Sequence, residues 1–284
     1  MRNLKKFFNL FLVLILAFTT FGCNNSNTVK SPVESETPAV VEQKEIIIFA
    51  AASMTETLSN IAEEYKKENA NVNIQFNFDS SGTLKTQIEE GAECDMFISA
   101  APKQMNQLDK GTDTESGLNM IDSSTRFNLL ENKVALSVTD KNEKNIDSFN
   151  TLVEKLKSKD VLLAIGNSDV PVGQYTQKIF QYFNLNEEDL VKDGVLTYGS
   201  NVKEVTTQVK EDVVDCGIIY QTDAYSAGLK VVDTATKDMC GQVIYPAALL
   251  KNSKNQNEAK KFLDYLKSDT AKKIFESVGF TPLV

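Results

Sequence analysis

Residues 46–50 read IIIFA, and the small and polar residues AASMT follow directly at 51–55. A continuous apolar run of this length is typical of a strand buried on both faces, as in a parallel sheet covered by helices. Working outward from this run, apolar residues recur at helical spacing over residues 54–65 and then alternate over residues 72–78. The start of the folded region therefore predicts a strand, a helix and a second strand.

The same order of elements continues along the chain. A short helix around Leu84 and Ile88 stops at Gly91, a strand follows at 96–98, and Pro102 opens another helix. After the polar, turn-like residues 110–126, a second series begins. Its expected elements are strands at 134–138, 161–165, 195–198 and 217–220, helices at 148–157, 173–183 and 202–211, a return segment at 243–250, and helices at 255–267 and 270–277.

This alternation predicts an α/β protein with two lobes, each built on a sheet with a parallel core and flanking helices. Because the chain starts one lobe, builds a second and then returns, we expect lobe 1 at residues 45–126 plus 240–284 and lobe 2 at 127–239. Two lobes joined by crossing segments leave a cleft between them, which is a favoured place for a ligand.

Composition excludes several classes of function. The 284 residues include 39 Asp and Glu against 30 Lys and Arg, for a net charge of −9. A nucleic-acid binder needs a basic surface, so we expect no nucleic-acid partner. The chain has no His, which removes Ser-His-Asp catalysis and every His-ligated metal site.

The N-terminus has the features of an export signal. Arg2, Lys5 and Lys6 precede a short apolar run at residues 10–18, too short for a stable membrane span, and Gly22-Cys23 follows. We interpret residues 1–22 as a signal peptide and Cys23 as a lipidation site that anchors the protein to the membrane. An ordinary signal peptide followed by an incidental Cys is the alternative.

Residues 23–44 follow as a tether. This segment contains two prolines and no aromatic residue, so it cannot bury enough apolar surface to fold. Lipidation of Cys23 leaves three cysteines in the folded region, namely Cys94, Cys216 and Cys240. The sequence leaves open whether Cys216 and Cys240 form a disulfide or stay as buried free thiols.

Four strand-to-helix junctions have a similar amino-acid composition. They are rich in Ser, Thr, Gly and Asn, poor in Lys and Arg, and lie at residues 51–56, 79–83, 166–173 and 199–202. Ser53 and Glu56 fit a capping box in the first of them. Each junction alone is an ordinary helix cap, but several facing one cleft would bind an anion through N–H groups and helix dipoles without a cation.

The junctions, taken in order, resemble the molybdate-binding proteins of bacterial ABC transporters, and the likeness covers roughly residues 45–284. The segments that carry it are FAAAS at 49–53, SSGTL at 80–84, DMFISA at 95–100, VPVGQY at 170–175, CGIIYQTDA at 216–224 and VGF at 278–280. The resemblance implies a two-lobed periplasmic-binding-protein fold of the type II kind, with molybdate or tungstate held in the cleft and no cofactor or catalytic residue.

The resemblance also implies which residues bind the oxyanion. These are the hydroxyls of Ser53, Ser81 and Tyr220 and the backbone at Val172 and Val202. Ser80 could share the role of Ser81, because Gly82 stands where the family often continues its serine run. The metal would be bound only as its oxyanion, with no direct protein ligand.

The resemblance implies a permease and its ATPase as partners, a place on the outer face of the cell membrane, and a monomer. Sulfate or phosphate is the alternative ligand, and Asp79 and Asp169 are candidate acceptors for a phosphate proton. A serine hydrolase using Ser53 or Ser81, with Lys85 as base, is a more distant alternative. A surface adhesin is another, but neither apolar patches nor repeats are evident.

Overall fold

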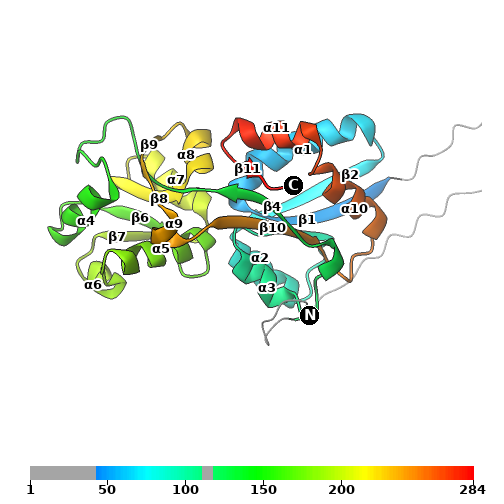
Figure 1. Ribbon diagram of the computed structural model, residues 1–284, viewed down its shortest axis with the longest axis horizontal. Helices are drawn as coiled ribbons and strands as arrows, with labels where there is room; N and C mark the ends of the chain where they lie inside the picture. Colours follow the sequence, from blue (N-terminus) through cyan, green and yellow to red (C-terminus); the bar gives the residue numbers. More distant parts are fainter. Residues whose placement is uncertain (1–42, 111–117) are drawn as a thin grey trace, which may run out of the picture. The chain divides into compact units, whose positions relative to one another are not determined.

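A computed structural model describes residues 43–110 and 118–284. These residues form two α/β lobes, each built around its own sheet, which confirms the predicted fold class (Figure 1). The predicted signal peptide at 1–22, Cys23 and nearly all of the predicted tether lie outside the described residues. Lys44, the last residue of that tether, already belongs to the first strand.

The first lobe contains a six-stranded sheet with the order β11-β4-β10-β3-β1-β2. β1 runs parallel to β2 and β3, whereas β10 is antiparallel to β3 and β4, so the parallel core that the sequence predicted forms one half of a mixed sheet. Its strands are β1 (Lys44–Ala51), β2 (Val72–Asp79), β3 (Met96–Ile98), β4 (Phe127–Asn132), β10 (Val243–Leu249) and β11 (Thr281–Pro282).

Helices cover both faces of this sheet because both faces of β1 are apolar. Ile46 and Ile48 pack into a core cluster with α1, α10 and α11, whereas Phe49 packs on the other face with α2 and α3. Figure 1 shows these two groups of helices on opposite sides of the strands. The bounds are η1 (Ala52–Met54), α1 (Thr55–Glu68), α2 (Ser81–Glu89), α3 (Pro102–Leu108), η2 (Ser123–Thr125), α10 (Gln256–Tyr265) and α11 (Asp269–Ser277).

The second lobe repeats this plan with five strands in the order β7-β6-β8-β5-β9. β6 is parallel to β7 and β8, and β5 is antiparallel to β8 and β9. Its strands are β5 (Val134–Val138), β6 (Leu163–Gly166), β7 (Leu196–Gly199), β8 (Cys216–Tyr220) and β9 (Lys230–Thr234). Its helices are α4 (Phe149–Lys157), α5 (Pro171–Tyr182), α6 (Glu187–Lys192), α7 (Val202–Lys210), α8 (Gln221–Ala227) and α9 (Lys237–Cys240).

The chain passes between the two sheets in two neighbouring segments. The first crossing is at Lys133, between β4 and β5, and the second precedes β10. Residues 127–132, which the sequence suggested for lobe 2, form β4 in the six-stranded sheet. Because β4 pairs with β10 and β11, which come more than a hundred positions later, no local pattern marks it as a strand of the first sheet.

Most predicted elements are confirmed within one or two residues, and the short ones were missed. The sequence analysis did not identify β4, α6, α8, β9, α9 and β11, which are mostly short elements of weak periodicity. Within the described ranges, no helix has both the length and the apolar character needed to cross a membrane.

Candidate functional site

The carboxyl ends of strands from both sheets meet at one small pocket. Its walls come from the ends of β1, β2 and β8 and from the segments that open α2, α5 and α7. The pocket is small, with a volume of only about 10 Å³ open to the centre of a water molecule. Of the predicted site residues, Ser53, Ser81, Val202 and Tyr220 line this pocket, and so does Ser80.

Ser53 lies in η1, a single 3-10 turn between β1 and α1, and is 4% exposed. Its Oγ is 2.9 Å from the hydroxyl oxygen of Tyr245. The predicted capping box of Ser53 and Glu56 is wrong, because the intervening 3-10 turn makes Met54 the N-cap of α1 and no side chain caps this helix. Ser53 therefore keeps its hydroxyl for the pocket and for Tyr245.

The two serines of the second junction have different roles. Ser80 is the N-cap of α2, and its Oγ accepts a hydrogen bond from the backbone N–H of Thr83 at 3.1 Å. Ser81 is fully buried, and its Oγ accepts from the backbone N–H of Ala100 at 3.0 Å. Accepting a hydrogen bond does not use the O–H of either serine; the Ser80 hydroxyl also lies 2.9 Å from that of Thr83, and both serines remain candidate donors to a ligand.

The second lobe contributes helix starts to the same pocket. Val202 is the first residue of α7, whose N-cap Asn201 accepts from the backbone of Glu204. α5 begins at Pro171, and no side chain caps it, so the N–H groups of its first turn, including that of Val172, are left uncapped. Val172 itself does not line the pocket; its neighbours Val170 and Pro171 do.

Tyr220 ends β8 with its side chain almost completely buried, at 1% exposure. The rings of Tyr175 and Tyr245 pack edge-on against it, yet its hydroxyl has no hydrogen-bond partner at normal geometry among the described residues. Burial, followed by the neighbouring tyrosine hydroxyls, raises the pKa of Tyr220 well above its usual value. A protonated, unpartnered hydroxyl buried in a pocket wall is a donor that lacks an acceptor.

Among the described residues, no Lys or Arg belongs to the pocket wall, and its one charged residue is Asp79. The Asp79 carboxylate accepts from the backbone of Ser80 at 2.7 Å and from the Asn201 side chain of the other lobe at 3.3 Å. Asp169, the other candidate acceptor for a phosphate proton, is exposed and is not part of the wall. The pocket therefore presents mainly uncharged donors.

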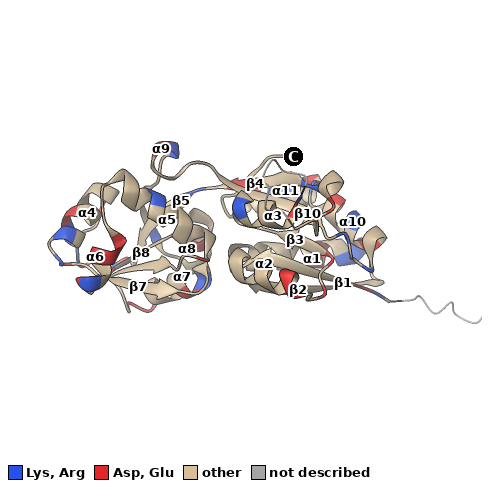
Figure 2. Cartoon of the chain, turned by 90° about the horizontal axis from the view of Figure 1, so that it is seen from below, with Lys and Arg blue, Asp and Glu red and all other residues tan. Residues whose placement is uncertain are grey.

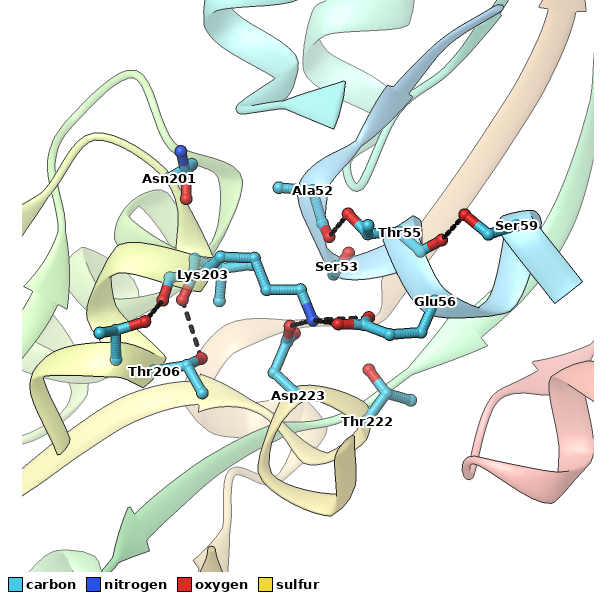
Figure 3. A network of polar contacts seen from close by, with 12 residues as sticks. Ala52, Ser53, Thr55, Glu56, Ser59, Asn201, Lys203, Thr206, Thr222 and Asp223 are labelled. Carbon is cyan, nitrogen blue, oxygen red and sulfur yellow. Dashed lines mark hydrogen bonds and ion pairs between the residues drawn. The ribbon is translucent and has the colours of Figure 1, made fainter. Parts of the chain in front are cut away.

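Lys203, the cation that directly follows the pocket residue Val202, is neutralised by two acids (Figure 3). The Lys203 ammonium, in the first turn of α7, lies 2.7 Å from Glu56 of the first lobe and 3.1 Å from Asp223 of its own lobe. Burial, opposed by Lys203, raises the pKa of Asp223 from 3.8 to about 6. Elsewhere, Figure 2 shows acidic and basic residues interspersed on helices such as α4, α6 and α10.

Besides this ion pair, the lobes touch at Gly82. A Cβ atom at residue 82, in the first turn of α2, would overlap the backbone carbonyl of Asp169 in the other lobe. Gly82 is the position at which the sequence departs from the serine run of the family it resembles. In this chain a side chain at residue 82 would hold the lobes apart at this contact.

The surroundings of the cysteines and of Lys85 bear on two further sequence hypotheses. Cys94, Cys216 and Cys240 are free and buried, so the open question of a Cys216–Cys240 disulfide is decided for free thiols. Lys85, the base that a hydrolase would need, forms an ion pair with Glu89 at 2.7 Å. The described residues contain no cluster of three potential metal-ligating acids or cysteines.

Two polar residues behind the pocket were missed by the sequence analysis. Tyr245 lies in β10 beside Ser53, and Asn132, at the end of β4, donates to the Tyr245 hydroxyl at 3.2 Å. Tyr245 sits within an apolar return segment, and Asn132 ends a strand that was not recognised. Neither belongs to a motif, so only the antiparallel pairing of β4 with β10 brings them together.

Comparison with known proteins assigns the class. A family model described as bacterial extracellular solute-binding protein matches residues 46–281, and the chain belongs to this family. More particularly, it is homologous to ModA, the molybdate-binding protein of Haemophilus influenzae, with 35% identity over 83% of this chain and 89% of that one. These are non-enzymatic transport components, which excludes the serine hydrolase.

Two further relatives cover the chain broadly. YvgL of Bacillus subtilis, provisionally named a substrate-binding lipoprotein of an ABC transporter, is 34% identical over 96% of this chain and 99% of its own length. The solved periplasmic molybdate-binding protein of Azotobacter vinelandii has a TM-score of 0.72 at 18% identity, covering 83% of this chain and 98% of that one. The second likeness supports the fold alone.

The environment of Asp223 generates a pH-dependent prediction. Because the folded protein holds the Asp223 proton more tightly than the unfolded chain, the stability that this group contributes is complete below pH 3.8 and is lost as the pH rises through about 6. Asp223→Asn cannot titrate. We therefore expect the melting temperature of this variant, relative to wild type, to rise between those pH values and then level off in thermal melts.

The exposed acid of α6, Glu188, provides the control. Glu188→Gln removes one carboxylate from the second lobe without touching Lys203, and its difference from wild type should stay nearly constant over the same pH series. A melting-temperature difference between Asp223→Asn and wild type that is independent of pH, or that falls as the pH rises, would contradict the burial argument.

Proposed function

We propose that this protein binds molybdate between its two lobes, with tungstate as the chemically similar alternative, and delivers it to the permease and ATPase of an ABC transporter. The observation that carries the proposal is a pocket walled by uncharged donors from both lobes, with no Lys or Arg in its wall. The homology to ModA directs the choice among oxyanions.

The physical basis is stabilisation of a dianion by dipoles alone. Hydrogen bonds to a charged acceptor are about twice as strong as neutral ones, and helix N-termini add a favourable field. We propose that Ser53, Ser81 and Tyr220 donate through their hydroxyls, and Val172 and Val202 through their backbone N–H groups. The small volume of the pocket favours a compact inorganic anion over an extended organic one.

Sulfate and phosphate are the competing ligands for the same pocket. Hydrogen phosphate carries a proton that needs an acceptor. Among the described residues of the wall, Asp79 is the one carboxylate; it accepts both of its protein hydrogen bonds at Oδ1, so Oδ2 is the one carboxylate oxygen that could take this proton. Sulfate has the charge and shape of molybdate but is smaller. We therefore expect molybdate and tungstate to bind more tightly than sulfate, and phosphate to bind weakest.

We also propose a place outside the cytoplasm, with a lipid on Cys23 and residues 23–44 as the tether, after removal of residues 1–22. The family is extracellular, and YvgL carries the lipoprotein name. The folded region would act as a monomer in two lobes, and closure around the anion would be the signal that the permease reads.

Ligand binding is the first prediction of this proposal. Molybdate at about 100 times its Kd should stabilise the protein by roughly 2.7 kcal/mol in thermal melts. Ser53→Ala and Tyr220→Phe should each weaken binding by about 1.5–3 kcal/mol in calorimetry, since each removes one hydrogen bond to a charged group. A melting shift with phosphate or sulfate, and none with molybdate, would transfer the assignment to those anions.

Lobe closure is tested at Gly82. Gly82→Ala places a methyl group against the Asp169 carbonyl, so we expect molybdate affinity to fall by roughly 1–3 kcal/mol, the usual cost of overpacking. Unliganded stability should hold or rise, because Ala is a better helix former than Gly. The exposed residue Thr86, one turn further along α2, gives the control Thr86→Ala, and equal affinities for both variants would disprove the contact.

Lipid attachment is tested at Cys23. In cells fed a radiolabelled fatty acid, the wild-type protein should incorporate label and sediment with membranes, and Cys23→Ser should lose both properties. Cys240→Ser is the matched control and should retain them. Label that persists in Cys23→Ser, or that is absent from wild type, would support the ordinary signal peptide instead.

A further inference from the structure

Behind the pocket, a chain of buried polar groups leads from the end of β4 to Ser53. The Asn132 side chain donates to the Tyr245 hydroxyl at 3.2 Å, and that hydroxyl lies 2.9 Å from the Oγ of Ser53. Asn132, Tyr245 and Ser53 are each at most 4% exposed. Water therefore has little access to these groups, and their protons must be satisfied by one another.

The direction of the first hydrogen bond is fixed by the backbone. The N–H of Lys133 donates to Oδ1 of Asn132 at 2.8 Å, so the amide oxygen faces Lys133 and the NH₂ group faces the other way. That NH₂ group donates both to Tyr245 and to Oγ1 of Thr222, at 2.9 Å, in the second lobe. A flipped amide would set two donors against each other at the Lys133 N–H, which can only donate.

The second direction follows from the first. A tyrosine hydroxyl has one proton, and burial raises the pKa of Tyr245 well above its usual value, so that proton stays in place. Asn132 is a donor and cannot receive it. The Tyr220 hydroxyl lies close enough to Tyr245 for this neighbour to contribute to the raised pKa of Tyr220, but among the described residues it has no hydrogen bond at normal geometry. Ser53 is the remaining acceptor, so Tyr245 donates to Ser53. The hydroxyl proton of Ser53 is then free to form a hydrogen bond to a ligand in the pocket.

We propose that Asn132 and Tyr245 are positioning residues that fix Ser53 as a hydrogen-bond donor to the bound oxyanion. They thereby favour fully deprotonated anions over hydrogen phosphate. This inference rests on the proposed oxyanion function. Ser81 has the same orientation, because its Oγ accepts from the backbone N–H of Ala100 and a backbone N–H can only donate. Asn132 is the point at which the direction can be changed.

The test reverses the direction of the hydrogen bonds from Asn132 through Tyr245 to Ser53 with one isosteric substitution. In Asn132→Asp, a carboxylate oxygen replaces the NH₂ group and accepts the Tyr245 proton, so Tyr245 must accept from Ser53, and Ser53 presents lone pairs to the pocket. The probes are sulfate and hydrogen phosphate at mildly alkaline pH, where both carry two charges. The new carboxylate repels both dianions alike, so this repulsion drops out of the ratio of their affinities. Calorimetry measures both affinities.

We expect the sulfate-to-phosphate affinity ratio to fall by about tenfold or more in Asn132→Asp, the equivalent of one hydrogen bond to a charged group. In a Tyr245→Phe background, the same change should leave the ratio constant within about twofold, because the chain is already broken. The matched control is Tyr65→Phe, which removes a buried hydroxyl with no partner far from the pocket and should leave the wild-type ratio unchanged.

The outcomes separate this inference from the proposed function. If wild type binds neither molybdate nor sulfate, the proposed function fails. If wild type binds and Asn132→Asp keeps its ratio, or lowers it equally in both backgrounds, only the positioning role fails. Should Asn132→Asp not fold, neutron diffraction of the anion-bound wild type decides, since a deuterium on Ser53 that points at Tyr245 overturns the proposal.

Discussion

A buried anion without a counter-cation can be stable only if oriented dipoles surround it, and under the proposed function this requirement accounts for how the two lobes are built. Parallel strands place their carboxyl ends at one edge of each sheet, and the helices that follow begin there with unsatisfied N–H groups. Both sheets direct that edge to the same pocket, so β1, β2 and β8 and the starts of α2, α5 and α7 all reach it. The mixed topology, with antiparallel β10 beside β3, then returns the chain to the first lobe.

The same requirement explains the placement of charge around the pocket. Lys203 follows Val202 directly and would otherwise bring an ammonium group close to the pocket. Glu56 and Asp223 bind it instead, and Glu56 comes from the opposite lobe, so the pairing also bridges the lobes. A carrier must release its cargo, and an anion held by neutral donors is released more readily than one paired with a fixed cation.

The sequence predicts the parts of this architecture that local chemistry determines. Buried runs such as residues 46–50 mark strands, and small polar junctions mark the pocket edge. By contrast, β4 is a strand of the first lobe only because β10 and β11 pair with it. The serine at residue 53 fits a capping box as a pattern, but one 3-10 turn moves it out of the cap, which spacing alone does not reveal.

The residues that hold Ser53 also lie where the chain passes between the lobes. Asn132 is the last residue of β4, directly before the first crossing, and Tyr245 lies in β10, just after the second. Asn132 also binds Thr222 at the start of α8, in the second lobe. Under the proposed role of Ser53, its hydroxyl is linked through Tyr245 and Asn132 to both crossing segments, and the Asn132 side chain contacts both lobes.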